Sequence, residues 1–307
     1  MENQSLHNME QYIPHLKGYQ DISPIHKGYS SDHKYCVSFQ DGWKYLLRMF
    51  DLKQREAKKA EFDVLQKMEL YSVKCSKPIE FGSVEPLGKG YMLLSYIEGE
   101  DAEEHIGKLP EEVQYKIGAD AGIELLKMHQ CPAPEPVSGW FDRKYKKHRR
   151  YMDQYHACGY KLKEDSKLQS FIDDHIELMK YRPNVFQHDD FHVGNLIIKD
   201  QQLAGVIDFN SYDWGDPIHE FLKVGFFSSE VSIPFAIGQM TGYHKGGQPD
   251  ERFWTLYSLY LAMSIYSSIV WILKVKPEEL DSMLEKIYRV LEDHNGFESV
   301  KPKWYSR

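Results

Sequence analysis

The chain has 307 residues, a formal net charge of −8 and a hydrophobic content of 42%. This length allows a substantial hydrophobic core in one large domain or in two lobes. The acidic balance argues against a general nucleic-acid-binding protein, which normally carries a basic face. It is compatible with a cationic ligand without requiring one. The composition is that of an ordinary globular protein.

The four cysteines are widely spaced and form no C-x-x-C pair, so neither a zinc ribbon nor a disulfide framework is expected. The N-terminal residues lack a basic stretch followed by an apolar one, so no signal peptide is expected. These features predict a cytoplasmic protein. Residues 253–273 contain no charged side chain and are long enough to span a bilayer. Their Ser, Thr and Tyr content favours a buried central helix, and no membrane contact is expected.

The first hundred residues have the pattern of a small sheet with one helix. A helical period runs through residues 52–70, and Asp41-Gly42 is a typical hairpin turn between two strand-like runs. The expected strands are residues 22–29, 34–40, 43–50, 77–83 and 90–97. Arg48 lies within an apolar strand, and a buried cation needs a partner. Glu61 on the predicted helix can reach it, and Glu56 is the alternative partner.

After residue 99 the pattern changes to helices. The expected helices are residues 110–129, 142–152, 163–181, 217–227, 233–243, 251–274 and 277–293. Strands followed by helices predict an α+β architecture of two lobes. We expect an N-terminal sheet lobe with one helix at residues 1–97 and a larger, mostly helical lobe at residues 98–307.

The candidate catalytic and metal-binding residues lie in residues 184–220. Two apolar runs, 196–198 and 204–207, are separated by a polar tract and predict a β-hairpin. The hairpin should bring Asp190, Asn195 and Asp208 to a common end. Oxygen-bearing side chains of this kind suit hard cations, Mg²⁺ above all, and one carboxylate can remain as a base.

The sequence His188-Asp189-Asp190, with Asn195 five residues later, resembles the H-G-D-x-x-x-x-N loop of the aminoglycoside phosphotransferase and choline kinase-like family. The resemblance implies a protein-kinase-like fold and a small-molecule kinase that uses ATP or GTP with Mg²⁺. It implies that Asp190 is the catalytic base and that His188 braces the loop. Asn195 and Asp208 then hold Mg²⁺.

The same resemblance assigns nucleotide-binding residues in the N-terminal part. It implies that the Arg48–Glu61 pair holds the α- and β-phosphates through the arginine. A hinge at Ser95, Tyr96 and Ile97 is expected to pair with adenine through backbone groups. The turn that contains Gly28, Ser30 and Ser31 lies where a loop would cover the phosphates, and its N–H and hydroxyl groups can donate to them.

The chain departs from the family pattern at two positions. Asp189 stands where the family usually has Gly, and Glu220 stands where an Asp usually follows Gly215-Asp216-Pro217. Asp216 is expected to cap the following helix. Asp189, Asp213 and, more weakly, Glu220 could attract a cationic acceptor, for which an aminoglycoside is the first candidate.

Other interpretations remain open at this stage. The acceptor could be a macrolide, choline, homoserine or a sugar amine. His188-Asp189 with His192 could belong to a metal phosphohydrolase, although such pairs belong on helices. A nucleotide-binding module without catalysis is a further alternative. Protein kinase activity is disfavoured because no G-x-G-x-x-G loop is present and no long segment follows Asp208.

Overall fold

The structure of the chain is a computed structural model that describes residues 9–27 and 31–306. Two units are distinguished by their internal contacts. One comprises Met1–Gly99 with Ala204–Asn210, and the other comprises Glu100–Leu203 with Ser211–Arg307. The division expected from sequence lies between residues 97 and 98. The units instead divide after Gly99, and the segment that ends the hairpin belongs to the first unit.

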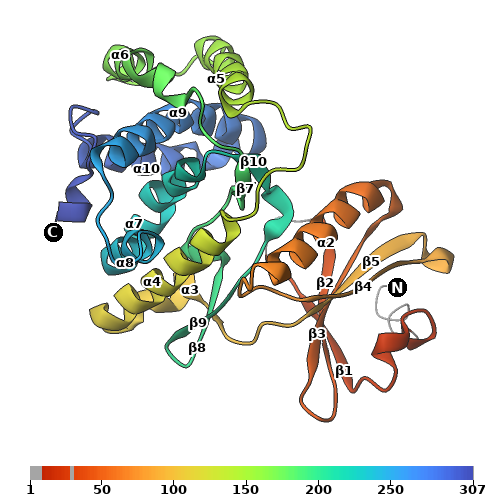
Figure 1. Cartoon of the computed structure of the whole chain (residues 1–307). Coiled ribbons are helices and arrows are strands. Elements are labelled where there is room, and N and C mark those ends of the chain that lie inside the picture. Colours follow the sequence, from red (N-terminus) through yellow and green to blue (C-terminus); the bar gives the residue numbers. More distant parts are fainter. Residues whose placement is uncertain (1–8, 28–30, 307) are drawn as a thin grey trace. The chain divides into compact units, whose positions relative to one another are not determined.

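The first unit contains a five-stranded antiparallel sheet of order β1-β2-β3-β5-β4 (Figure 1). Its strands are β1 (Asp21–Ile25), β2 (His33–Ser38), β3 (Lys44–Asp51), β4 (Pro78–Val84) and β5 (Lys89–Ser95). The predicted hairpin turn is confirmed, because β2 and β3 pair from Ser38 opposite Lys44 and Gly42 has a φ of 85°. Glycine adopts this left-handed conformation without steric cost.

Both faces of this sheet are covered by apolar side chains. On one face lies α2 (Arg55–Leu70), where Phe62 packs on Phe81 of β4 with ring centroids 5.5 Å apart. Two short 3₁₀ turns before β1 cover the other face, and Met9, Ile13 and Leu16 from them are buried against the sheet. The single helix and the small sheet therefore match the sequence prediction.

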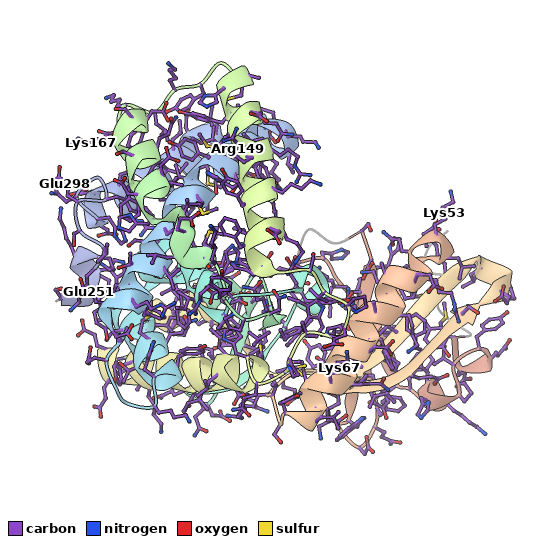
Figure 2. All side chains as sticks on the ribbon, turned by 45° about the horizontal axis from the view of Figure 1, so that its top comes forward. Lys53, Lys67, Arg149, Lys167, Glu251 and Glu298 are labelled. Atoms are coloured by element: carbon purple, nitrogen blue, oxygen red, sulfur yellow. The ribbon has the colours of Figure 1, made fainter. Side chains whose placement is uncertain are left out.

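The second unit is mostly helical and is organised around one long apolar helix (Figure 1). Its helices are α3 (Ala102–His105), α4 (Glu111–Met128), α5 (Trp140–Ala157), α6 (Asp165–His175), α7 (Ser229–Val231), α8 (Ile233–Tyr243), α9 (Glu251–Val275) and α10 (Leu280–Asp293). Helices α5, α6 and α10 pack against α9. An exposed ion pair of 3.2 Å between Lys167 and Glu298 ties α6 to the C-terminal segment (Figure 2).

Helix α9 is the one described helix that is long and apolar enough to cross a membrane by length and composition. However, 67% of its most apolar window is buried within the structure. Tyr257, Tyr260 and Ile265 are fully buried there. This burial is what a core helix requires, as the sequence prediction of a buried helix at residues 251–274 states.

Short strands lie between the helices. β8 (Leu196–Lys199) and β9 (Gln202–Val206) are neighbours in a sheet of order β6-β8-β9, where β6 is Glu100–Asp101. The predicted hairpin at residues 196–207 is thereby confirmed. A second pair, β7 (Val185–Gln187) with β10 (Asp213–Gly215), was not predicted, because three-residue strands carry no detectable alternation.

The predicted helix at residues 217–227 is present, but most of it is not α-helical. The structure has a 3₁₀ helix at Pro217–Phe221 and a π-helix at Val224–Ser228. In the π-helical turn, Gly225 and Phe226 present carbonyl oxygens to Arg289 of α10, at 3.1 and 2.7 Å. These tertiary hydrogen bonds stabilise the wider turn and have no local sequence signal. The helix predicted at 163–181 is also shorter, since α6 ends at His175 and a 3₁₀ helix, Ile176–Met179, follows.

Helices α4 and α8 approach each other through glycines. A Cβ atom at Gly122 would lie 2.2 Å from the carbonyl oxygen of Gln239, and one at Gly242 would lie 2.0 Å from that of Ala119. We expect Gly122→Ala to lower the free energy of unfolding by about 1–3 kcal/mol, because backbone atoms must move apart. Urea denaturation measures this loss. Gly107→Ala is the control, since no atom lies within 4 Å of a Cβ there. Equal stability of the two variants would contradict the prediction.

His294 makes stability depend on pH. It is 1% exposed, its Nδ1 lies 2.9 Å from the Ser299 carbonyl, and burial lowers the pKa of its imidazole to about 4. An unfolded chain takes up this proton below about pH 6.5, whereas the folded chain does so only near pH 4. Stability should therefore fall by roughly 3 kcal/mol as the pH drops through this window.

Urea denaturation of His294→Gln at several pH values tests this prediction. The variant should show a shallower loss of stability between pH 6.5 and pH 4 than the wild type. His156→Gln, at an exposed histidine of α5, should leave the slope unchanged. An unchanged slope in His294→Gln would show that burial of this imidazole does not set the pH dependence.

Candidate active site

The loop between β7 and β8 carries the predicted catalytic residues. His188 is fully buried at its start, and a 3₁₀ helix at Val193–Asn195 ends it. Asp189 has a φ of 60°, in the left-handed region that favours glycine. Aspartate is one of the few other residues that adopt this conformation readily. The backbone thus explains why Asp189 occupies a position at which the related loops have Gly.

Asp190 is held from two sides. Its Oδ1 accepts a hydrogen bond of 2.7 Å from Lys223 Nζ, and its Oδ2 accepts one of 3.1 Å from Asn195 Nδ2. His192 Nε2 lies 3.6 Å from the same carboxylate. Burial alone raises the pKa of Asp190, but the hydrogen bond with His192 and the charge of Lys223 outweigh it and lower the pKa well below the usual range. Asp190 is therefore ionised at neutral pH.

Asn195 has one side of its amide engaged and one side available. Its Nδ2 donates to the backbone carbonyl of Asp190 at 2.8 Å and to the Asp190 carboxylate. In the described part of the chain, no donor contacts its Oδ1. An amide oxygen is a suitable ligand for Mg²⁺. The residue therefore fits the metal-binding role expected from sequence.

Asp208 lies in the other unit. It follows β9 with a φ of 70° and is half-buried, whereas Asp190 and Asn195 belong to the second unit. Its approach to Asn195 stays a prediction. Within residues 9–27 and 31–306, no three His, Cys, Asp or Glu side chains form a cluster that could hold a metal ion. His188 and Asp189 lie in a loop after β7, not on the helix that the phosphohydrolase interpretation requires.

Glu220 stabilises the catalytic loop through hydrogen bonds with its backbone. Its carboxylate is completely buried and accepts hydrogen bonds from the backbone N–H of Asp189, at 3.2 Å, and of Phe191, at 3.3 Å. His129 Nε2 lies 3.9 Å away. Burial raises the pKa of Glu220, but His129 and His188 lower it below its usual value overall. This burial leaves no surface for an acceptor, so we assign Glu220 to loop support in place of acceptor binding.

The carboxylate of Asp216 is buried and accepts hydrogen bonds from several different elements. As expected, it caps the following 3₁₀ helix by accepting the Ile218 N–H at 3.0 Å. Arg182 donates to both of its oxygens at 2.7 and 2.8 Å, and the Tyr260 hydroxyl donates at 2.6 Å. Its backbone carbonyl accepts from Gln187, at the end of β7. This network fixes the strand that leads into the catalytic loop.

The two acids expected to attract a cationic acceptor both lie beside basic side chains of the protein. Asp213 forms an ion pair of 3.1 Å with Arg143 of α5. Asp189 Oδ1 lies 3.4 Å from His219 Nδ1. Burial and the neighbouring Glu220 raise the pKa of Asp189, an effect that Lys223 and Lys144 oppose. Neither acid therefore presents an unopposed negative charge.

In the first unit, Arg48 pairs with Glu61, and the described residues show no contact with the alternative partner, Glu56. A second carboxylate, Asp32, also binds this guanidinium, with Arg48 Nε and Nη2 at 3.0 and 2.5 Å from its Oδ2. Lys58 lies 2.7 Å from the same oxygen. All four side chains are nearly buried. Two cations and two carboxylates thus form one network, of which sequence analysis identified one pair.

The other residues expected to contact the nucleotide belong to the turn near Ser31 and to the hinge at residues 95–97. Gly28 and Ser30 lie outside the described residues, and the Ser31 hydroxyl accepts a hydrogen bond of 3.2 Å from Gln54. In the expected hinge, the N–H groups of Ser95 and Tyr96 donate to the backbone carbonyls of Lys77 and Lys44, at 2.8 and 3.3 Å. Ile97 is the hinge residue whose backbone has no such partner among the described residues.

Sequence analysis missed Lys223, Arg182, Tyr260 and Asp32. Each contacts a predicted site residue from another element. Lys223 directly precedes the π-helix, an element type that often marks functional sites. A lysine three residues after Glu220 is the one signal in the sequence that could have indicated it.

Comparison with known proteins identifies relatives of this arrangement. The sequence model of the phosphotransferase enzyme family (APH) matches residues 21–257, more than half of the chain. No curated protein matches the sequence significantly.

Solved structures share the fold at low sequence identity. The gentamicin complex of APH(2″)-IIa has a TM-score of 0.66 at 15% identity and covers 92% of this chain and 96% of its own. The GDP complex of aminoglycoside 2′-phosphotransferase-IIIa has a TM-score of 0.67 at 12% identity, with coverage of 94% and 97%. A thermostable APH(4)-Ia variant with ADP and hygromycin B has a TM-score of 0.65 at 12% identity, with coverage of 92% and 97%. The expected protein-kinase-like fold is thereby confirmed.

Proposed function

Because the chain belongs to the phosphotransferase enzyme family, we propose that it transfers the γ-phosphoryl group of ATP or GTP to a hydroxyl group of a small molecule in the cytoplasm. Family membership makes the chain a phosphotransferase with an alcohol group as acceptor. The observation that carries the proposal is the carboxylate of Asp190, held between Lys223 and Asn195 in the loop that follows β7.

Asp190 acts as the base in this proposal. The acceptor oxygen forms a bond to the γ-phosphorus, the bond from that phosphorus to the bridging oxygen breaks, and the nucleoside diphosphate leaves. Asp190 orients the hydroxyl and takes its proton. Its low pKa makes it a weak base, which is sufficient because a loose transition state requires proton acceptance only late. Lys223 and His188 position the loop and do not exchange protons with the acceptor.

We assign Asn195 and Asp208 as the Mg²⁺ ligands. When bound, the ion neutralises charge on the nucleotide phosphates. The unengaged Oδ1 of Asn195 supports its part of this assignment. Asn195 also links the metal site to the base, because its Nδ2 holds the Asp190 carboxylate.

For the nucleotide, we propose contacts from Arg48, Ser31 and the backbone near Ile97, with Gly28 and Ser30 completing the phosphate loop. Glu61 orients the Arg48 guanidinium. Ser95 and Tyr96 support the hinge through the strand hydrogen bonds of their N–H groups.

Two acceptor classes follow from different observations. The structural neighbours are aminoglycoside phosphotransferases, so an aminoglycoside is one candidate, with antibiotic resistance as the corresponding role. The basic side chains that pair with Asp189 and Asp213 weaken the case for recognition of the acceptor by its positive charge, so another small hydroxylated metabolite or antibiotic is the second candidate. Macrolides, choline, homoserine and sugar amines belong to this second group.

A coupled assay of nucleoside diphosphate production tests the proposal. The full chain is incubated with ATP or GTP and Mg²⁺ in the presence of acceptors from both classes. We expect acceptor-dependent production in the wild type and its loss in Asp190→Asn. Acceptor-dependent production that persists at wild-type rate in Asp190→Asn would contradict the assigned base.

A further inference from the structure

Three cations of α5 line a small cavity beside the catalytic loop. Arg143, Lys144 and Lys147 face a space of about 40 Å³ whose other walls include Asp189 and His219. This volume accommodates a small polar group. Asp189 immediately precedes the proposed base, so the cavity borders the place where the acceptor hydroxyl must lie.

Arg143 is held by contacts within the protein and is not simply an exposed residue on the solvent side of α5. Its guanidinium pairs with Asp213 at 3.1 Å and also donates to the backbone carbonyls of Ser138 and Trp214. These contacts fix the first turn of α5 against β10. By contrast, Arg149 lies further along the same helix (Figure 2) and is exposed. The basic residues at the cavity therefore differ in environment from those further along α5.

Lys144 is half-buried, and its one side-chain partner among the described residues is a neutral imidazole. Its Nζ lies 2.5 Å from His219 Nε2, and no other acceptor contacts it within the described part of the chain. The ammonium group has three donors, so two remain for a ligand. Since Nε2 of His219 accepts this bond, its Nδ1 carries the proton and faces Asp189 at 3.4 Å.

The charges at the cavity sum to an excess of positive charge. The negative charge of Asp213 is paired with Arg143, which leaves Lys144 and Lys147 facing the single carboxylate of Asp189. Burial and the charge of Lys147 lower the pKa of Lys144, although Asp189 raises it. A bound anion would supply an anionic partner for Lys144 and stabilise its charged ammonium form.

We propose that this cavity is an anion-binding subsite and that the acceptor is a hydroxylated small molecule carrying a carboxylate or a phosphate monoester, an inference that rests on the phosphotransferase activity proposed above. The anionic group binds Lys144 and Lys147, and the hydroxyl group reaches Asp190. A cationic acceptor would instead place its charge against two lysines.

Lysine variants separate this role from a general effect on folding or on nucleotide binding. We expect Lys144→Met and Lys147→Met each to raise the KM for the acceptor about tenfold or more and to leave the KM for the nucleotide unchanged. Lys147 is exposed, so its replacement preserves the fold. Lys146→Met is the matched control, because Lys146 is an exposed neighbour on α5 that does not line the cavity. A rise confined to the nucleotide KM would overturn the assignment.

Matched acceptor pairs identify the chemistry. A hydroxy acid is compared with its amide, and a sugar phosphate with the unphosphorylated sugar. We expect the charged member of at least one pair to have the higher kcat/KM, and the pair concerned distinguishes carboxylate from phosphate. If the protein preferred neutral or cationic acceptors, and if Lys144→Met did not change that preference, the anion-binding subsite would be excluded. The proposed phosphotransferase activity would still stand.

A binding measurement gives an answer independent of turnover. Calorimetric titration of the full chain with inorganic phosphate and with acetate should show binding of at least one ion. The double variant Lys144→Met/Lys147→Met should lose that binding, and Lys146→Met should retain it. Equal binding by the double variant and the wild type would exclude the subsite. Lysine-dependent binding without turnover of any acceptor would contradict the proposed activity but uphold the subsite.

Discussion

Replacing Asp190 with asparagine is expected to lower kcat by about 10²–10⁴-fold, the usual contribution of a positioned base. Asparagine keeps the shape of the side chain and can still accept the hydrogen bond from Asn195. It cannot take the proton of the acceptor hydroxyl, and it loses the ion pair with Lys223. Steady-state kinetics measure the effect, and nucleotide affinity should stay close to that of the wild type.

The control for this prediction lies in the hairpin that follows the catalytic loop. Asp200 is an exposed carboxylate in the turn between β8 and β9, with a φ of 50° that asparagine also adopts. Asp200→Asn should retain wild-type kcat. If Asp190→Asn were as active as Asp200→Asn, the base would have to be another group.

Replacing Arg48 with methionine is expected to lower the free energy of unfolding by about 3–5 kcal/mol. The variant removes the guanidinium from between the buried carboxylates of Asp32 and Glu61 and leaves Lys58 near both of them. Urea denaturation measures the loss. We also expect weaker nucleotide binding, since the proposed phosphate contact is removed.

Two further variants test the network itself. Lys53→Met, at an exposed lysine just before α2 (Figure 2), should leave stability unchanged. The double variant Arg48→Met/Glu61→Gln also removes the negative charge of Glu61, which Arg48→Met leaves without its partner. Its loss in free energy of unfolding should therefore be smaller than the sum of the losses in Arg48→Met and Glu61→Gln. Additive losses, or a loss in Arg48→Met no larger than that in Lys53→Met, would show that these charges are not coupled.

Local patterns allowed much of this architecture to be predicted. The hairpin at residues 196–207 follows from two apolar runs and a polar tract, and α9 follows from a long uncharged segment. The Arg48–Glu61 pair follows from the rule that a cation within a buried strand needs a partner. In each of these cases the determining signal lies within one element or between consecutive elements.

Contacts between distant elements could not be predicted in the same way. Asp216 meets Arg182, 34 residues away, and Tyr260, 44 residues away, and neither partner is marked by its local sequence. Glu220 was expected near the acceptor because its charge is visible in the sequence, whereas its burial depends on His129 and the catalytic loop. The environment of Asp189 could not be predicted for the same reason, because the lysines near it come from the distant helix α5.

The most direct test of the central claim is the stoichiometry of phosphoryl transfer by the full chain. Nucleoside diphosphate and phosphorylated acceptor are quantified in one reaction by chromatography and mass spectrometry, with Mg²⁺ present. Our account predicts equal amounts of the two products from the wild type, and about 10²–10⁴-fold slower formation of both from Asp190→Asn. Release of inorganic phosphate without any phosphorylated alcohol would contradict it.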